Sequence, residues 1–89
     1  MQLPDRWTQT QYEWLSALGR TKDPIPLLRQ NRAWQRPDWV CERLDALQGL
    51  SPAEMRRLLP AVRGLIVVAD RTGDIEMRCY ARIKLLSMH

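Results

Sequence analysis

Arginine is the main charged residue type in this chain of 89 residues. All but two of its 14 basic residues are arginines, so most of its positive charge is carried by guanidinium groups. A guanidinium makes paired hydrogen bonds to phosphate or carboxylate. Residues 20–36 carry five basic side chains against one aspartate, which matches the net charge of +4 of the whole chain. Within them, residues 29–36 (RQNRAWQR) interleave guanidinium, amide and indole groups, which contact phosphates, base edges and ring faces in nucleic-acid complexes. This segment predicts a surface for a polyanionic partner. A solvated connection with Trp34 tucked into the core is the alternative.

A second group of arginines follows a strong helix-start signal. Ser51 and Glu54 have the spacing of a capping box, and Pro52 stands at a first helical position, where its missing N–H does no harm. A helix over 52–63 then carries charged side chains opposite an apolar face, and an ordinary solvated face is the alternative interpretation. The two groups and one turn residue together give the candidate nucleic-acid or partner-binding residues, which are Arg29, Arg32, Trp34, Arg36, Glu54, Arg56, Arg57, Arg63 and Arg71.

The sequence offers few residues suited to catalysis or to metal binding. The single histidine is His89, and Cys41 and Cys79 fit neither a CxxC spacing nor a zinc-ligand spacing. The chain also has no Gly-rich phosphate loop and no nucleophile elbow. We therefore predict a protein that is not an enzyme and binds no cofactor or metal. Two buried thiols are expected rather than a disulfide.

The elements that must position the arginines are predicted to be mainly helical. Apolar spacing and end signals predict helices over residues 8–19, 37–48 and 52–63. Gly19 is expected to end the first helix, and Pro60 to kink or shorten the last. A short element begins after two prolines that break the chain near residue 25.

The last third of the chain has the pattern of a β-hairpin. Residues 65–69 (LIVVA) are typical of a strand, residues 70–74 (DRTGD) favour a turn, and residues 75–85 alternate apolar with polar side chains. Apolar side chains from residue 75 onward also lie at helical spacing, which leaves a helix as the alternative. The predicted fold is thus mainly α with a C-terminal β-hairpin, and an all-α five-helix arrangement is the rival.

Residues 39–83 resemble a winged helix-turn-helix domain in the order of their predicted elements. The similarity is carried by residues 49–59 (GLSPAEMRRLL) and by residues 62–66 (VRGLI), which look like the turn, the recognition helix and the step into the wing. The resemblance implies a winged-helix-like α+β fold. It also implies a major-groove face made by Pro52, Ala53, Glu54, Arg56 and Arg57, with Arg71 at the wing tip.

A second resemblance, to a HEAT-type helical repeat, rests on residues 58–62 and on residues 74–85 as parts of two successive helices. It implies a chain of five helices without a hairpin, in which a single repeat has no neighbour to cover its apolar face.

These observations predict a single small domain, residues 1–89, that acts as a small basic DNA-binding regulator or accessory protein. It would read DNA with helix 52–63 and the C-terminal wing, as a cytoplasmic homodimer joined through its tryptophan-bearing first helix. No apolar stretch long enough to cross a membrane is present. The alternative is a protein–protein interaction module, such as an adaptor, an inhibitor or a small subunit, that binds an acidic protein surface. Its four tryptophans favour that alternative.

Overall fold

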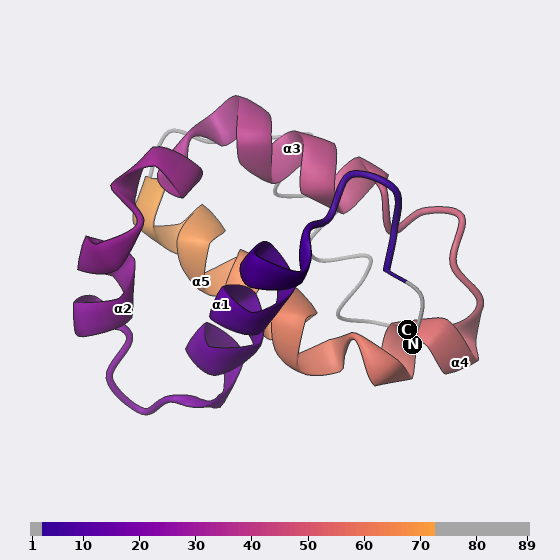
Figure 1. The fold of residues 1–89 in the computed structure, drawn as a ribbon, viewed down its shortest axis with the longest axis horizontal. Helices are drawn as coiled ribbons and strands as arrows, with labels where there is room; N and C mark the ends of the chain where they lie inside the picture. Colours follow the sequence, from indigo (N-terminus) through magenta and orange to yellow (C-terminus); the bar gives the residue numbers. More distant parts are fainter. Residues whose placement is uncertain (1–2, 73–89) are drawn as a thin grey trace.

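The computed structural model describes residues 3–72, and this range forms five α-helices and one 3-10 helix without a strand. In chain order the elements are α1 (Gln9–Arg20), α2 (Ile25–Gln30), η1 (Arg32–Gln35), α3 (Pro37–Asp45), α4 (Pro52–Arg57) and α5 (Leu59–Thr72). In Figure 1, α1 and α5 cross at the centre, α3 runs along the top, and α2 and α4 lie at opposite ends. The described part of the chain is therefore mainly helical. None of its helices is long and apolar enough to cross a membrane.

Helix α1 begins where the sequence predicts it. Thr8 accepts a hydrogen bond from the backbone N–H of Gln11, and the Gln11 side chain accepts one from the backbone N–H of Thr8, so both halves of a capping box are present. The inward face of α1 then buries Trp14, Leu15 and Leu18. This face makes the largest interface of the described chain, which is with α5.

Two glycines allow α1 and α5 to cross at close range. A Cβ atom at Gly64 would lie 2.0 Å from the carbonyl oxygen of Leu15, and a Cβ atom at Gly19 would lie 1.9 Å from that of Pro60. Both sites exclude any side chain because the obstacle is backbone. Gly19 therefore does not end α1, which continues to Arg20, and the prediction of a stop there is wrong.

The predicted strand over 65–69 is also wrong, because these residues are the middle of α5. Ala61, Leu65 and Val68 recur at helical spacing and are fully buried. A short apolar run satisfies either a buried strand or a buried helix, and here the partner is the face of α1. The first part of the predicted turn, residues 70–72, is helical as well. Residues 74–85, for which the second strand or the second HEAT-like helix was predicted, lie outside the described residues.

Helix 52–63 is not continuous, because α4 ends at Arg57 and α5 begins at Leu59. Ser51 and Glu54 form the predicted capping box at the start of α4. Pro60 has no N–H to donate to a carbonyl one turn earlier, so a continuous helix would lose a hydrogen bond at this point. The chain avoids that loss by a break at Leu58 that places Pro60 in the first turn of the next helix. The expected shortening is thus confirmed.

The buried apolar core is built mainly from α1, α3 and α5, with contributions from α2 and from the segments before α1 and between α3 and α5. Its members are Trp7, Trp14, Leu15, Leu18, Leu28, Val40, Leu44, Leu47, Leu58, Ala61, Val62, Leu65, Val68 and Ala69. The side chains of Trp7 and Trp14 are 5% and 6% exposed. Both indoles are therefore packed inside the chain, Trp14 on α1 and Trp7 just before it, and they are not available to a dimer surface on the first helix.

Cys41 lies on α3 and is half-buried. It is disulfide-bonded, so the prediction of a free buried thiol is wrong for this residue. Cys79 lies outside the described residues.

Candidate nucleic-acid interface

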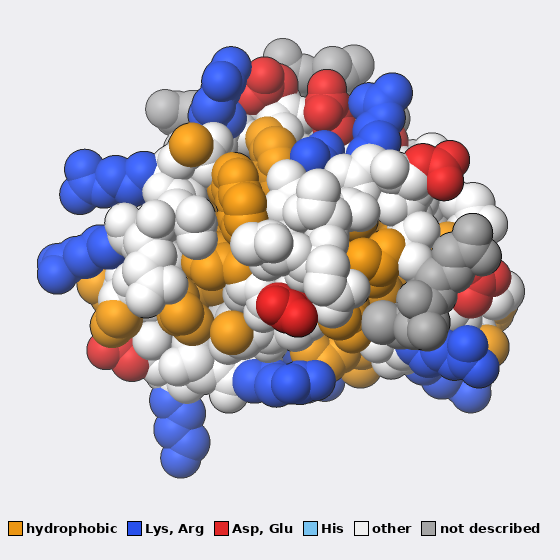
Figure 2. All heavy atoms as spheres, in the orientation of Figure 1, with side chains coloured by type: hydrophobic (Ala, Val, Ile, Leu, Met, Phe, Trp, Pro, Cys, Tyr) orange, Lys and Arg blue, Asp and Glu red, His pale blue; other side chains and the backbone are white. Residues whose placement is uncertain are grey.

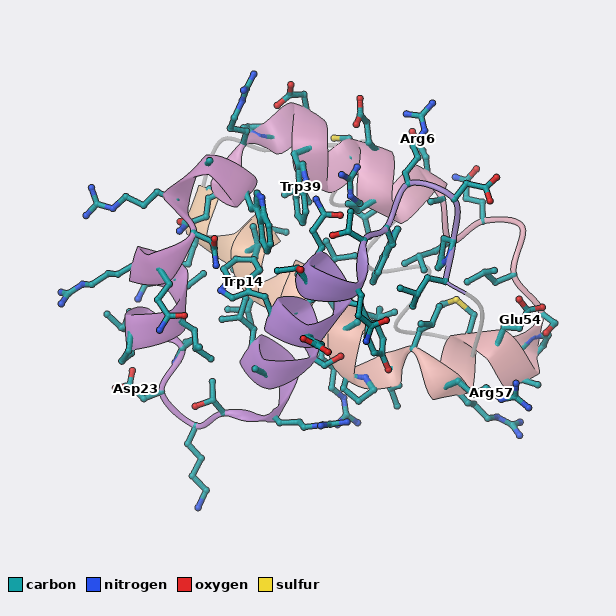
Figure 3. The ribbon with its side chains drawn as sticks, viewed as in Figure 1. Arg6, Trp14, Asp23, Trp39, Glu54 and Arg57 are labelled. Atoms are coloured by element: carbon teal, nitrogen blue, oxygen red, sulfur yellow. The ribbon has the colours of Figure 1, made fainter. Side chains whose placement is uncertain are left out.

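The arginines selected from the sequence lie in two groups at opposite ends of the molecule. Arg29 and Arg32 belong to α2 and η1, whereas Arg56 and Arg57 belong to α4. Figure 2 shows basic side chains gathered at the α2 end and again over α4, and Figure 3 places Arg57 at the α4 end. The predicted residues therefore do not form one continuous surface.

The α2 end brings three of the predicted arginines together around one hollow. Arg29 comes from the last turn of α2, Arg32 from the start of η1, and Arg71 from the last turn of α5. The hollow has a volume of about 310 Å³, and Ile25, Leu28 and Gln35 complete its lining. We call this feature the arginine hollow, defined by these six residues. Arg71 joins it only because residues 65–72 are helical, so the expected wing-tip arginine lies beside the basic segment instead.

Electrostatically, the arginine hollow is positive and its cations are unneutralised. Within residues 3–72, no carboxylate forms an ion pair with Arg29, Arg32 or Arg71, and all three side chains are exposed. The residues that line the hollow include no acid. Asp70 is exposed beside Arg71 in the sequence.

The floor of the arginine hollow is held in place by a contact between α2 and η1. The Gln35 side-chain amide donates a hydrogen bond to the backbone carbonyl of Leu28. This bond satisfies one of the carbonyls that the end of α2 leaves without a helical partner. It also fixes η1 against α2, so that Arg29 and Arg32 stand on a connected support.

Arg36 and Arg63 take no part in the arginine hollow. Arg36 pairs with Asp38 at 3.4 Å, and both side chains are well exposed. Arg63 is exposed on α5. An exposed pair of this kind contributes little to stability because water screens it.

At the α4 end, the expected recognition residues stand beside acidic groups. Arg56 and Arg57 are exposed in the last turn of a helix of only six residues. The carboxylate of Glu54 accepts hydrogen bonds from the Ser51 hydroxyl at 3.0 Å and the Ser51 N–H at 3.5 Å, so it serves the helix start. Glu54 also lines a second hollow of about 550 Å³, whose other lining residues are Leu3, Pro4, Asp5, Arg6, Glu42, Asp45, Ala46, Gly49 and Leu50. The lining of this second hollow has four carboxylates and one arginine, so the hollow would repel a phosphate backbone.

Trp34 belongs to a row of aromatic rings. Its ring meets Trp14 edge-on at a centroid distance of 5.1 Å and stacks on Trp39 at 5.9 Å with an interplanar angle of 3°. Trp14 is anchored in turn by its Nε1, which donates to the Leu27 carbonyl at 2.9 Å. Figure 3 shows Trp14 and Trp39 directed into the space between α1, α2 and α3. Trp34 is thus half-buried against the core, as the alternative interpretation of its segment predicted.

The guanidinium of Arg43 packs against the outer ring of this row, that of Trp39. Arg43 was not among the residues selected from the sequence. Its guanidinium lies 4.7 Å from the centroid of the Trp39 ring, and its Nη1 lies 3.4 Å from a carboxylate oxygen of Glu42. Burial lowers the pKa of Arg43, and the charge and hydrogen bond of Glu42 act in the opposite direction. The four-residue spacing of Trp39 and Arg43 on one helix was the available signal, because such residues share a helix face.

No family model, no curated protein and no solved structure matches this chain. In residues 3–72, no cluster of three or more histidine, cysteine, aspartate or glutamate side chains is arranged to hold a metal ion. The case for function therefore rests on the geometry and charge of the two hollows.

Proposed function

We propose that this protein is a small nucleic-acid-binding protein without catalytic activity, a DNA-binding regulator or accessory factor, that contacts phosphates through Arg29, Arg32 and Arg71. One observation carries the proposal, namely that three exposed guanidiniums, none of them ion-paired with another residue of 3–72, converge from α2, η1 and α5 on one hollow. Charge-assisted, paired hydrogen bonds from arginine suit phosphate oxygens.

The proposed contact surface differs from the one that the winged-helix resemblance implies. A recognition helix needs a length of exposed helix that enters the major groove. Here the residues nominated for that role are divided between α4 and α5. In addition, Glu54, Glu42 and Asp45 line the hollow beside α4, where they would repel a phosphate backbone.

Phosphate contacts fix position and carry no sequence information by themselves. A site made of three arginines without base-reading partners therefore predicts binding that depends little on sequence and strongly on salt. Cytoplasmic location and dimerisation remain predictions from the sequence.

The test compares two triple variants that remove the same charge from opposite ends of the molecule. The first is Arg29→Gln/Arg32→Gln/Arg71→Gln, and the matched control is Arg56→Gln/Arg57→Gln/Arg63→Gln. Affinity for a labelled duplex is measured by fluorescence anisotropy at low salt, after circular dichroism has shown native helix content for both proteins. Loss of binding in the first variant with near-native binding in the control is the expected result. Equal losses in the two variants, or a larger loss in the control, would contradict the assignment of phosphate binding to the arginine hollow and would place Arg56, Arg57 and Arg63 in the interface.

The second candidate, a protein–protein interaction module, is favoured by the hollow at the α4 end. Its lining combines the apolar side chains of Leu3 and Leu50 with carboxylates such as Glu42, which suits a partner carrying basic and apolar groups. An acidic partner would use the arginine hollow instead. Absence of DNA binding at low salt in the wild-type protein, followed by capture of a partner that Glu42→Gln weakens, would favour this function over the first.

A further inference from the structure

The arginine hollow has two kinds of wall, which restricts the ligands that fit it. Arg29, Arg32 and Arg71 supply positive charge and N–H donors at its rim. Ile25 supplies a small, half-buried apolar side, whereas Leu28 is only 5% exposed and offers a ligand little surface. A ligand that fills the hollow would therefore carry a compact anion joined to a less polar group.

The rim arginines can contact a phosphodiester inside a duplex, but such a phosphate does not enter the hollow or use all of its donors. It carries one negative charge, its two free oxygens lie on the convex outside of the double helix, and a sugar leaves it on each side. Three guanidiniums around a concave site therefore exceed what one internal phosphate can accept. The rim is better matched by an anion with more charge and more free oxygens.

A phosphate monoester at the end of a strand has those properties. It carries between one and two negative charges at neutral pH and presents three terminal oxygens as hydrogen-bond acceptors. It is joined to a single sugar, so it can enter a hollow of about 310 Å³ from one side. The adjoining sugar then lies beside the half-buried side chain of Ile25.

We infer that the arginine hollow binds the terminal phosphate monoester of a nucleic-acid strand, with Arg29, Arg32 and Arg71 on the phosphate and Ile25 beside the first nucleotide. This inference rests on the proposed nucleic-acid binding and deepens it. It makes the protein a reader of strand ends rather than of internal sequence. Arg32 is the central ligand, because its element η1 follows α2 and contacts α5.

The experiment uses one short DNA oligonucleotide in two forms, with a 5′-phosphate and with a 5′-hydroxyl, each labelled at the 3′ end. We expect the phosphorylated form to bind about tenfold more tightly, because it adds charge and paired hydrogen bonds at the rim. Inorganic phosphate should compete with the phosphorylated form and leave the weaker binding of the other form largely unchanged. A 3′-phosphorylated oligonucleotide with a 5′ label shows which strand end is accepted.

Substitutions in the protein test whether the preference for a phosphorylated strand end comes from the arginine hollow. Arg32→Gln should abolish the difference between the two forms, Arg32→Lys should recover part of it, and Arg57→Gln should leave it intact. Equal binding of phosphorylated and unphosphorylated strands by the wild-type protein would overturn the inference while leaving nucleic-acid binding in place. A preference that survives Arg32→Gln would overturn the assignment to this hollow. No binding of either form at low salt would instead reject the proposed function.

Discussion

Replacing Gly64 by alanine is expected to destabilise the protein, although alanine is the better helix former. In an exposed helix the change would add about 1 kcal/mol of stability. Here the new Cβ atom would stand 2.0 Å from the carbonyl oxygen of Leu15 and 2.7 Å from its carbonyl carbon, whereas ordinary contacts begin near 3.4 Å. The α1 backbone would therefore have to retreat by roughly 1 Å or more, since these atoms have no rotamer by which to move aside.

The loss of stability in Gly64→Ala depends on which packed side chains separate when the α1 backbone moves away from α5. Moving α1 away from α5 opens the interface in which Leu15 of α1 and Leu65 of α5 are fully buried, and overpacking a core costs about 1–3 kcal/mol. After subtraction of the gain of about 1 kcal/mol in helix propensity, we expect a net loss of about 1 kcal/mol, which corresponds to a melting temperature lower by roughly 5 °C for a domain of this size. Thermal unfolding followed by circular dichroism measures it directly.

Gly49→Ala provides the matched control, since it makes the same chemical change in open space. No heavy atom lies within 4 Å of a Cβ atom built at Gly49. This variant should melt at or slightly above the wild-type temperature, because alanine restricts the unfolded chain. If Gly64→Ala melts as high as the wild-type protein or higher, α1 and α5 do not cross at this point and the described packing is incorrect.

Three further substitutions test individual contacts. Trp14→Phe removes the hydrogen bond to the Leu27 carbonyl and part of a buried ring, and should lower the free energy of unfolding by about 1–2 kcal/mol in urea titrations. Ser51→Ala removes the side-chain cap of α4 and should cost about 1 kcal/mol, with recovery in Ser51→Asp as the check. Arg6→Ala breaks an exposed pair with Glu42 at 3.8 Å, so the free energy of unfolding from urea titrations should fall by less than about 0.5 kcal/mol. A larger loss would contradict the assignment of this contact as an ordinary surface ion pair.

Local signals predicted the starts of helices well, because each one is decided by a few neighbouring residues. Thr8, Ser51 with Glu54, and Pro37 all stand at helix starts, as their residue types indicate. The glycines were harder to interpret, since a glycine that ends a helix and a glycine that lets another helix approach look alike in sequence. Gly19 is of the second kind, and only the position of Pro60 in space shows it.

The segment 65–72 is the point at which sequence reasoning failed on the fold, and the candidate site changed with it. Its β-branched residues favour a strand locally, and the helix is adopted because the face of α1 covers its apolar side chains. Arg29, Arg32 and Arg71 were each selected for phosphate contact from their type and neighbours. Their convergence depends on α5 ending beside α2 and η1, which is a long-range property that no local pattern contains.

The measurement that tests the central claim most directly is the salt dependence of DNA binding by the wild-type protein and by the Arg29→Gln/Arg32→Gln/Arg71→Gln variant. Each neutralised phosphate contributes about 0.9 to the slope of log affinity against log salt concentration on duplex DNA. Three arginines around one hollow reach one or two phosphates, so the variant should lose affinity and its slope should fall by about 1 to 2. The Arg56→Gln/Arg57→Gln/Arg63→Gln protein should keep the wild-type slope. An unchanged slope in the first variant would contradict the assignment of phosphate binding to the arginine hollow.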